Sequence, residues 1–195
     1  MTLPAAYFDR LYADSADPWG FRTRWYERRK YALTLAALPE PRFAAGLEVG
    51  CSIGVLTAEL AARCDSLVAL DVSRQALRAA RERAPGVDFR LGAVPGDWPT
   101  GRYDLVVLSE VACYLDRADL AALLDRTGAD LVPGGVVLAC HWRYPVADYP
   151  QTGAAVHAAM AARWPVLTGV VDPDFRLDVF QPTGAVGVAR RTGLV

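Results

Sequence analysis

The sequence lacks an excess of charge of either sign. Its 21 basic residues nearly balance its 22 acidic residues, and the formal net charge is −1. A protein that binds nucleic acid or an anionic membrane through long-range attraction usually carries a basic surplus. We therefore expect no nucleic-acid partner and no membrane partner, and a small neutral molecule is the expected ligand. The pattern does not predict the oligomeric state.

The sequence also lacks long apolar runs. No run approaches the roughly 18 consecutive apolar residues of a membrane-spanning helix, and the chain does not start with a basic and then apolar targeting segment. The 4 cysteines, which are Cys51, Cys64, Cys113 and Cys140, form no C-x-x-C pair. We expect a cytoplasmic protein with reduced structural thiols and no metal site.

Internal repeats, low-complexity tracts and linkers are absent as well. The length of 195 residues suits one domain with a substantial core. We expect a single domain over residues 1–195, divided into a helical arm over residues 1–40 and a sheet-containing core over residues 41–195.

Short apolar segments alternate with segments of helical periodicity. This alternation predicts an α/β fold with a parallel sheet that helices cover on both faces. Strands are expected at 47–49, 67–71, 87–91, 103–108 and 135–140, with helices at 55–63, 74–83, 116–131 and 153–164. Segments 166–171 and 175–181 are expected to form an antiparallel hairpin, and segments 5–13 and 21–38 two helices before the sheet.

The most informative segment follows the first expected strand. It reads Gly50-Cys51-Ser52-Ile53-Gly54, is preceded by Glu48, and leads through a helix to a second strand that ends at Asp71. Glycines let such a turn tighten against a ligand, and the N–H groups that open the next helix face that ligand. An acid at the end of the second strand can accept hydrogen bonds from both hydroxyls of a ribose. The segment therefore predicts a nucleotide-binding site.

Two other ligand or reaction classes compete for this turn. A dinucleotide site uses G-x-G-x-x-G/A, but Ser52 and Val55 stand where the second and third small residues belong. The letters also match the G-x-S-x-G nucleophile elbow of a serine hydrolase, with Ser52 as the nucleophile and His141 or His157 downstream. The elbow would lie on the first strand without an upstream oxyanion loop, so the hydrolase remains the weaker alternative.

The pattern E-x-G-x-S-x-G followed by a strand-terminal acid resembles class I S-adenosylmethionine-dependent methyltransferases. In that family the middle position is usually glycine, and Ser52 fits if its φ is negative or its side chain points away. The resemblance implies a Rossmann-like three-layer sandwich that binds S-adenosyl-L-methionine and releases S-adenosyl-L-homocysteine. It places the expected cofactor-binding residues at Trp19, Tyr26, Arg29, Glu48, Gly50, Ser52, Gly54, Asp71, Val72, Ala93, Val94 and Ser109.

The N-terminal arm supports a narrower resemblance. It is rich in aromatic and basic side chains, and its D-P-W-G-F and Y-E-R-R-K-Y segments resemble the NodS-type nodulation N-methyltransferases. Helical spacing puts Arg22, Tyr26 and Arg29 on one face, expected to meet the ligand, and Trp25 on another, expected to pack on the sheet. The resemblance implies that the arm forms a lid and that the acceptor is an amino sugar or a related polar molecule.

Residues that follow the fourth and fifth expected strands are the catalytic candidates, since ligands bind beyond the carboxyl ends of strands. Glu110 and His141 could hold an amine nucleophile and accept its proton. Each also has a structural alternative, since Glu110 could cap the next helical turn and His141 could be a packed ring. The expected substrate-binding residues are Trp142, Arg143, Tyr144 and Tyr149.

We thus expect an S-adenosylmethionine-dependent methyltransferase that acts on nitrogen. Methylation of oxygen is the first alternative. Hydrolysis at Ser52 and cofactor binding without catalysis are the alternatives from other classes.

Overall fold

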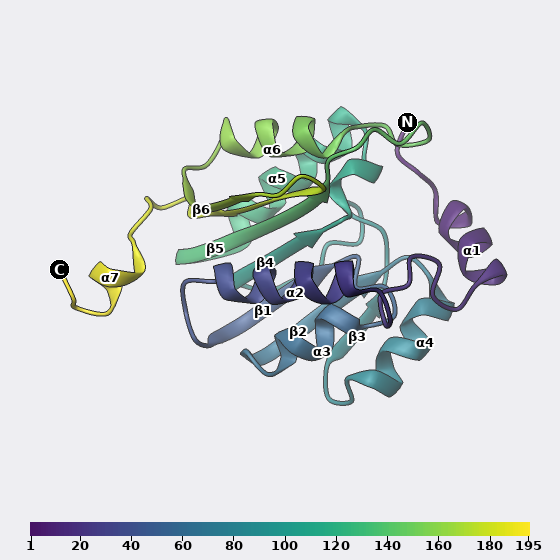
Figure 1. The fold of residues 1–195 in the computed structure, drawn as a ribbon, viewed down its shortest axis with the longest axis horizontal. Coiled ribbons are helices and arrows are strands. Elements are labelled where there is room, and N and C mark those ends of the chain that lie inside the picture. Colours follow the sequence, from purple (N-terminus) through teal and green to yellow (C-terminus); the bar gives the residue numbers. More distant parts are fainter.

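The computed structural model describes residues 1–195 and contains a seven-stranded sheet in the order β3-β2-β1-β4-β5-β7-β6 (Figure 1). The strands are β1 (Phe43–Val49), β2 (Cys64–Asp71), β3 (Asp88–Leu91), β4 (Tyr103–Ser109), β5 (Leu131–Trp142), β6 (Val166–Val171) and β7 (Phe175–Phe180). The first five strands pair in parallel, and β7 is antiparallel to both β5 and β6. The expected Rossmann-like fold, with its antiparallel C-terminal hairpin, is confirmed.

Seven α-helices and one 3-10 helix connect and flank these strands. They are α1 (Ala5–Asp14), α2 (Trp25–Ala37), α3 (Val55–Ala61), α4 (Arg74–Arg83), η1 (Ala112–Tyr114), α5 (Arg117–Asp130), α6 (Gly153–Ala161) and α7 (Val188–Arg191). None of these helices combines the length and the apolar character needed to cross a membrane.

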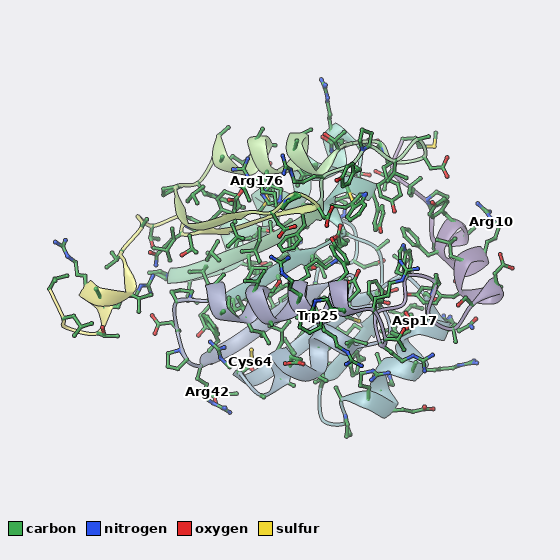
Figure 2. The ribbon with its side chains drawn as sticks, viewed as in Figure 1. Arg10, Asp17, Trp25, Arg42, Cys64 and Arg176 are labelled. Carbon is green, nitrogen blue, oxygen red and sulfur yellow. The ribbon has the colours of Figure 1, made fainter.

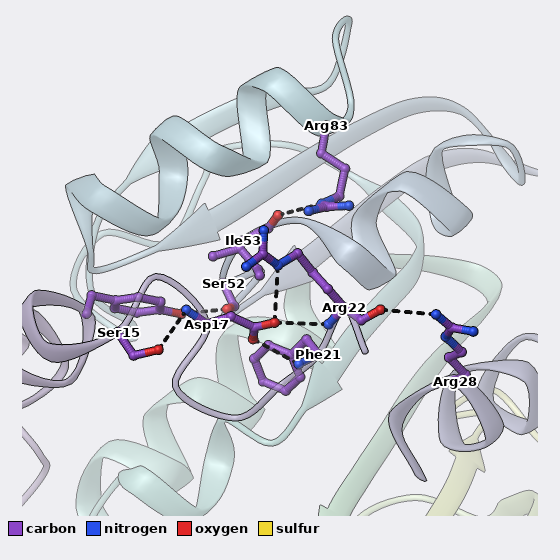
Figure 3. A network of polar contacts seen from close by, with 9 residues as sticks. Ser15, Asp17, Phe21, Arg22, Arg28, Ser52, Ile53 and Arg83 are labelled. Atoms are coloured by element: carbon purple, nitrogen blue, oxygen red, sulfur yellow. Dashed lines mark hydrogen bonds and ion pairs between the residues drawn. The ribbon is translucent and has the colours of Figure 1, made fainter. Parts of the chain in front are cut away.

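The second helix starts four residues later than the sequence predicts. The Asp17 carboxylate accepts the backbone N–H groups of Phe21 and Arg22 and also faces the Arg22 guanidinium (Figure 3). These bonds hold a turn over residues 17–22 and prevent the helix from starting there. Arg22 therefore lies before α2 and does not share a helical face with Tyr26 and Arg29.

Alternating side chains of the strands enter two cores, one on each face of the sheet. Leu105 and Val107 of β4 pack with α2 and α3, while Val106 and Leu108 pack with α5 and α6. A strand with both faces covered reads as a continuous apolar run, as this one does. The four cysteines are buried and have free thiols, as the sequence predicts.

The buried face of α2 differs from the expected one. Trp25 is 74% exposed (Figure 2), whereas Glu27, Lys30 and Tyr31 are buried. Apolarity alone would have turned Trp25 inward. The opposite face is buried instead. Its charged residues Glu27 and Lys30 form an ion pair with each other, and Lys30 also pairs with Glu110, the residue after β4.

Candidate active site

A cavity of about 470 Å³ lies beyond the carboxyl ends of β1, β2 and β4, and the N-terminal arm covers it. In Figure 1, α1 lies beyond the same end of the parallel strands. Small-molecule sites of open α/β sheets occupy this position, and the volume suits such a site. The lining includes these sequence-predicted residues: Trp19, Tyr26, Glu48, Gly50, Ser52, Asp71, Val72, Ala93, Val94, Ser109, Glu110, Trp142 and Tyr149.

Three predicted site residues lie outside this lining because the β6–β7 turn binds them. Arg29 forms an ion pair of 2.7 Å with the Asp172 carboxylate. Arg143 donates to the Asp172 carbonyl at 2.6 Å, and the Tyr144 hydroxyl donates to Asp174 at 3.2 Å. These polar groups fasten α2 and the loop after β5 to the hairpin, and they do not face the cavity.

Gly54 also lies outside the lining, although it shapes the turn. Its φ of +76° is favourable only for glycine, and a Cβ atom there would lie 2.9 Å from the Ala80 backbone. The glycine lets α3 start directly against α4. Gly54 therefore allows close packing beneath the Gly50–Gly54 turn and does not contact the cavity.

Of the two ways in which Ser52 was expected to fit the turn, a negative φ is wrong, because its φ is +52°. Two contacts hold it there: its N–H donates to Asp71 Oδ2 at 2.7 Å, and its hydroxyl pairs with the Tyr12 hydroxyl. Both histidines are buried and bonded to other groups. Ser52 therefore has no imidazole base beside it, which disfavours the hydrolase alternative.

Asp71 ends β2 with its carboxylate at the cavity. The carboxylate accepts the N–H groups of Ser52 and Ser73, at 2.7 and 2.8 Å. Burial raises the pKa of Asp71, and these two hydrogen bonds oppose that rise. Each oxygen keeps a further lone pair, so the carboxylate can also accept hydrogen bonds from ligand hydroxyls.

Glu48 is a buried carboxyl group with unused hydrogen-bonding capacity. It is 3% exposed, lines the cavity, and its Oε2 has no partner. Burial raises the pKa of Glu48 to about 8, with the Thr57 hydroxyl opposing the rise and the Asp71 carboxylate adding to it. A buried polar atom without a partner is costly, so this position favours a ligand that supplies a donor or a positive charge.

Lys30 joins two carboxylates at the cavity wall. Its Nζ lies 2.9 Å from Glu110 Oε1 and 3.0 Å from Glu27 Oε2, and its side chain is 2% exposed. Burial would lower the pKa of Lys30, but Glu110 and Glu27 outweigh burial and raise it. The three groups, which we call the charge triad, carry a net charge of −1 when both carboxylates are ionised.

Glu110 is fixed by contacts on both carboxylate oxygens. Oε1 accepts from Lys30, and Oε2 accepts the Trp142 backbone N–H at 2.9 Å. Its φ of +55° is uncommon for a residue other than glycine and marks a constrained position. The Glu110 side chain does not cap the following helical turn, so the structure does not support the capping role considered for it.

His141 lies outside the cavity, with 0% exposure. Its Nε2 accepts the Ala112 N–H at 3.3 Å, and its Nδ1 faces His157 Nε2 at 3.2 Å. Burial, then His157 and Lys30, hold the pKa of His141 well below its usual value. This placement does not fit the expected role as a base that contacts the acceptor, and it agrees with the packed-ring alternative.

Several residues of the wall, above all Glu27 and Lys30, were not predicted from the sequence. Their spacing of three residues on a helix was the available signal, because such residues are neighbours. The signal was weak because exposed helices carry similar pairs. Other lining residues that were not singled out are Phe8, Tyr12, Phe21, Arg24, Tyr31 and Tyr114.

Aromatic rings form much of the remaining wall. Tyr26 and Trp142 meet edge to face with ring centroids 5.6 Å apart, and Tyr114 and Tyr149 do so at 4.8 Å. The Tyr26 hydroxyl is buried without a hydrogen-bond partner. Rings with polar tips suit a ligand that has both an apolar face and hydroxyl or amine groups.

Comparison with known proteins agrees with this geometry. The family described as "Methyltransferase domain" matches residues 47–135. A solved structure from Pseudomonas syringae, assigned as a methyltransferase, is 48% identical, with a TM-score of 0.71, and the match covers 80% of this chain and 99% of that one. The chain belongs to the class I S-adenosylmethionine-dependent methyltransferases. The matched segment contains the glycine turn, Asp71 and Glu110.

Two curated relatives show which kinds of protein this methyltransferase is similar to. Nodulation protein S of Rhizobium tropici is 32% identical over 124 residues, 61% of this chain and 52% of that protein. A Streptomyces fradiae dTDP-3-amino-3,6-dideoxy-alpha-D-glucopyranose N,N-dimethyltransferase is 32% identical over 120 residues, 58% of this chain and 47% of that protein. The chain spans about half the length of the curated relatives it matches.

The NodS fold is also shared. The structure of N-methyltransferase NodS from Bradyrhizobium japonicum WM9 in complex with S-adenosyl-L-homocysteine has a TM-score of 0.80. The sequences are 22% identical, and the match covers 90% of this methyltransferase and 96% of NodS. At this identity the comparison establishes the fold.

The cavity residues fit the family's cofactor, S-adenosyl-L-methionine. Asp71 can accept the two ribose hydroxyls, and the unpartnered Glu48 Oε2 can accept the ammonium group of the methionine part. The exposed Arg24 offers a cation at the same cavity for the methionine carboxylate. The donors and acceptors of this wall therefore complement those of the cofactor.

Removal of the Asp71 carboxylate should weaken cofactor binding. We expect Asp71→Ala to reduce the affinity for S-adenosyl-L-homocysteine by roughly 1.5 to 3 kcal/mol, the range for hydrogen bonds to a charged group. Titration calorimetry of both proteins measures this difference. Asp65→Ala, which removes an exposed acid from the start of the same strand, is the matched control. Equal affinities for the wild type and Asp71→Ala would contradict the assignment.

Cofactor binding should release a proton from Glu48. Because burial holds its pKa near 8, Glu48 is mostly protonated at pH 6 to 7, and an ammonium group beside it favours ionisation. We therefore expect the affinity for S-adenosyl-L-homocysteine to rise with pH over this range. Calorimetry in buffers of different ionisation enthalpy counts the released proton. Glu48→Gln should remove both effects, and a wild type without proton release would contradict the prediction.

Proposed function

We propose that this methyltransferase transfers a methyl group from S-adenosyl-L-methionine to the amine nitrogen of a small polar acceptor, an amino sugar or a related natural product. The observation that carries the proposal is the Glu110 carboxylate. It lies directly after β4 at a cavity whose wall includes several aromatic side chains, and Lys30 and the Trp142 N–H fix its two oxygens.

A carboxylate at this place suits nitrogen as the acceptor atom. An aliphatic amine is largely protonated at neutral pH, and the ammonium form has no lone pair for attack. Glu110 can bind this ammonium group and take one proton, which leaves a neutral amine held in the cavity. The net charge of −1 on the charge triad favours a cationic acceptor over an anionic one.

The other residues of the cavity align the acceptor nitrogen with the methyl group and exclude water. When bound, S-adenosyl-L-methionine would supply an electrophilic methyl group together with a neutral thioether as the leaving group, so the acceptor nitrogen would need only its lone pair. Tyr26 and Trp142 enclose the acceptor beside Glu110, and the arm closes the cavity. Positioning of this kind accounts for a large part of the rate of such displacements.

The aromatic wall and the relatives support an amino sugar. Trp142 and Tyr149 line the cavity, and their rings can pack against the apolar face of a sugar. The names of two relatives, N-methyltransferase NodS and the aminodideoxyglucose N,N-dimethyltransferase, specify methylation of nitrogen, and the second specifies an amino sugar.

The test is a comparison of three sugars that differ at one position. Purified protein and labelled S-adenosyl-L-methionine are incubated with glucosamine, N-acetylglucosamine or glucose, and the products are identified by mass spectrometry. We expect N-methylation of glucosamine alone. Methylation of glucose at a rate similar to that of glucosamine would favour transfer to oxygen and overturn the proposal. Fluorophosphonate labelling that is lost in Ser52→Ala would favour the hydrolase alternative.

A further inference from the structure

The two histidines of the chain form a buried row of hydrogen bonds that spans four elements. Asp178 on β7 contacts His157 on α6 at 2.6 Å, and His157 contacts His141 on β5 at 3.2 Å. His141 then accepts the N–H of Ala112, the first residue of η1, at 3.3 Å. Asp178 is 2% exposed, and both imidazoles and Ala112 are fully buried. We call these four residues the histidine chain.

The hydrogen bond from the Ala112 N–H to His141 determines which ring nitrogens of the histidine chain carry protons. A backbone N–H can only donate, so Nε2 of His141 carries no proton. The proton of the neutral His141 ring is then on Nδ1 and donates to Nε2 of His157. His157 in turn carries its proton on Nδ1 and donates it to Asp178. Both rings are neutral, because a second proton on either ring would place two donors in contact.

The histidine chain ends at the segment that carries Glu110. Residues 140–142 of β5 hold this segment at three points: the Cys140 carbonyl accepts the Glu110 N–H, the Trp142 N–H donates to the Glu110 carboxylate, and the His141 ring accepts the Ala112 N–H. Glu110 itself has a positive φ. Such a conformation persists only where neighbouring contacts determine it.

The helix that supplies His157 packs unusually closely on the same strand end. At Gly153, the first residue of α6, a Cβ atom would lie 2.5 Å from the Trp142 carbonyl oxygen and 2.8 Å from His141 Cβ. Only glycine permits this approach. One turn later the helix presents His157 to His141.

We propose that the histidine chain is a positioning device that sets the Glu110–Ala112 segment, and through it the Glu110 carboxylate, at the cavity wall. His141 is thus a positioning residue rather than the base. The chemical consequence of Glu110 placement rests on the proposed function, but the proton positions and the hold on Ala112 do not. Burial and the groups His157 and Lys30 all disfavour a charged His141 ring.

The first test is nitrogen NMR of protein labelled only in the histidine rings. Since the protein has 2 histidines, their four ring nitrogens give four signals. We expect both Nδ1 atoms to be protonated and both Nε2 atoms to be unprotonated, and His141 to stay neutral from pH 8 to pH 5. Protonation of Nε2 in His141, or its titration near the ordinary histidine value of about 6.5, would overturn the proposal.

The second test compares two substitutions of His141. Leu removes the acceptor of the Ala112 N–H, whereas Gln keeps a side-chain oxygen that can accept it. We expect faster hydrogen exchange at Ala112 in His141→Leu and recovery in His141→Gln. With glucosamine as acceptor, we expect kcat to fall about tenfold to a hundredfold in His141→Leu, with KM for the cofactor nearly unchanged, and to recover in His141→Gln.

Met160→Ala is the matched control, because it removes apolar packing from α6 without removing a polar group. We expect it to lower stability while kcat changes little at a temperature where the protein is folded. Equal losses of kcat in Met160→Ala, His141→Leu and His141→Gln would overturn the proposal in favour of a general packing effect. If no acceptor is methylated at all, the proposed function fails, and the NMR and exchange results decide the role of the histidine chain.

Discussion

Glu110→Gln should lower kcat for methyl transfer to glucosamine by about 10²- to 10⁴-fold, the usual contribution of a positioned acid or base. Gln has nearly the volume of Glu, but its amide accepts a proton poorly, so the ammonium form of the acceptor stays unreactive. Lys30 keeps its contact with Glu27, and the wall remains assembled. The measurement is steady-state kinetics, with KM for S-adenosyl-L-methionine expected to change little.

The pH dependence separates this role from a structural one. At higher pH the solvent deprotonates the amine, and we expect the difference between Glu110→Gln and the wild type to shrink. Glu59→Gln, which removes an exposed carboxylate from α3, is the control and should keep the wild-type rate. A Glu110→Gln enzyme with wild-type kcat at neutral pH would exclude Glu110 as the proton acceptor.

Lys30→Met should destabilise the fold by about 3 to 5 kcal/mol at neutral pH, the typical result of removing one partner of a buried ion pair. Met fills the space of the Lys30 stem, but Glu27 and Glu110 are left facing each other without a cation. Burial already raises the pKa of Glu27 in the folded protein, and loss of the Lys30 cation, which opposes that rise, should raise it further. The loss of stability is then largest at pH values above the raised pKa of Glu27 and shrinks as the pH falls below it. Denaturant unfolding at several pH values measures it.

Arg29→Met is the matched control for Lys30→Met. It removes the basic residue directly before Lys30 in α2, but the Arg29 side chain, unlike that of Lys30, is 45% exposed. We expect a cost below about 1 kcal/mol, because exposed ion pairs contribute little. Similar losses for the two variants would mean that the charge triad has no special part in holding α2 against the sheet.

The central part of the sheet was predictable because its strands are apolar runs bounded by turn residues. For example, the segment around Val106 reads as a doubly covered strand, and the Gly50 to Gly54 turn is readable from its letters. These features depend on local pattern, and local pattern is what one sequence contains.

The side-chain partners of the site were less predictable because they depend on pairs that are distant in the sequence. Lys30 meets Glu110 across 80 positions, and nothing near Lys30 in the sequence marks it as buried. The same applies to Trp25, which an apolarity argument places inside and the structure leaves outside. His141 was identified as important because it follows the expected strand 135–140, but its role depends on His157 and Asp178, which other elements supply.

Different parts of the arm that covers the cavity are held by different kinds of contact, and this affects how ligands enter and leave. Near α1 the arm is held by the buried rings of Phe8 and Tyr12 and by hydrogen bonds, such as those from the Leu3 N–H to the Tyr114 carbonyl and from the Gln75 amide to the Tyr12 carbonyl. The buried Lys30 secures α2 to the sheet. Entry and departure should therefore proceed by lifting of α1 and residues 15–24 while α2 stays in place, and the rate of that opening sets an upper limit on turnover.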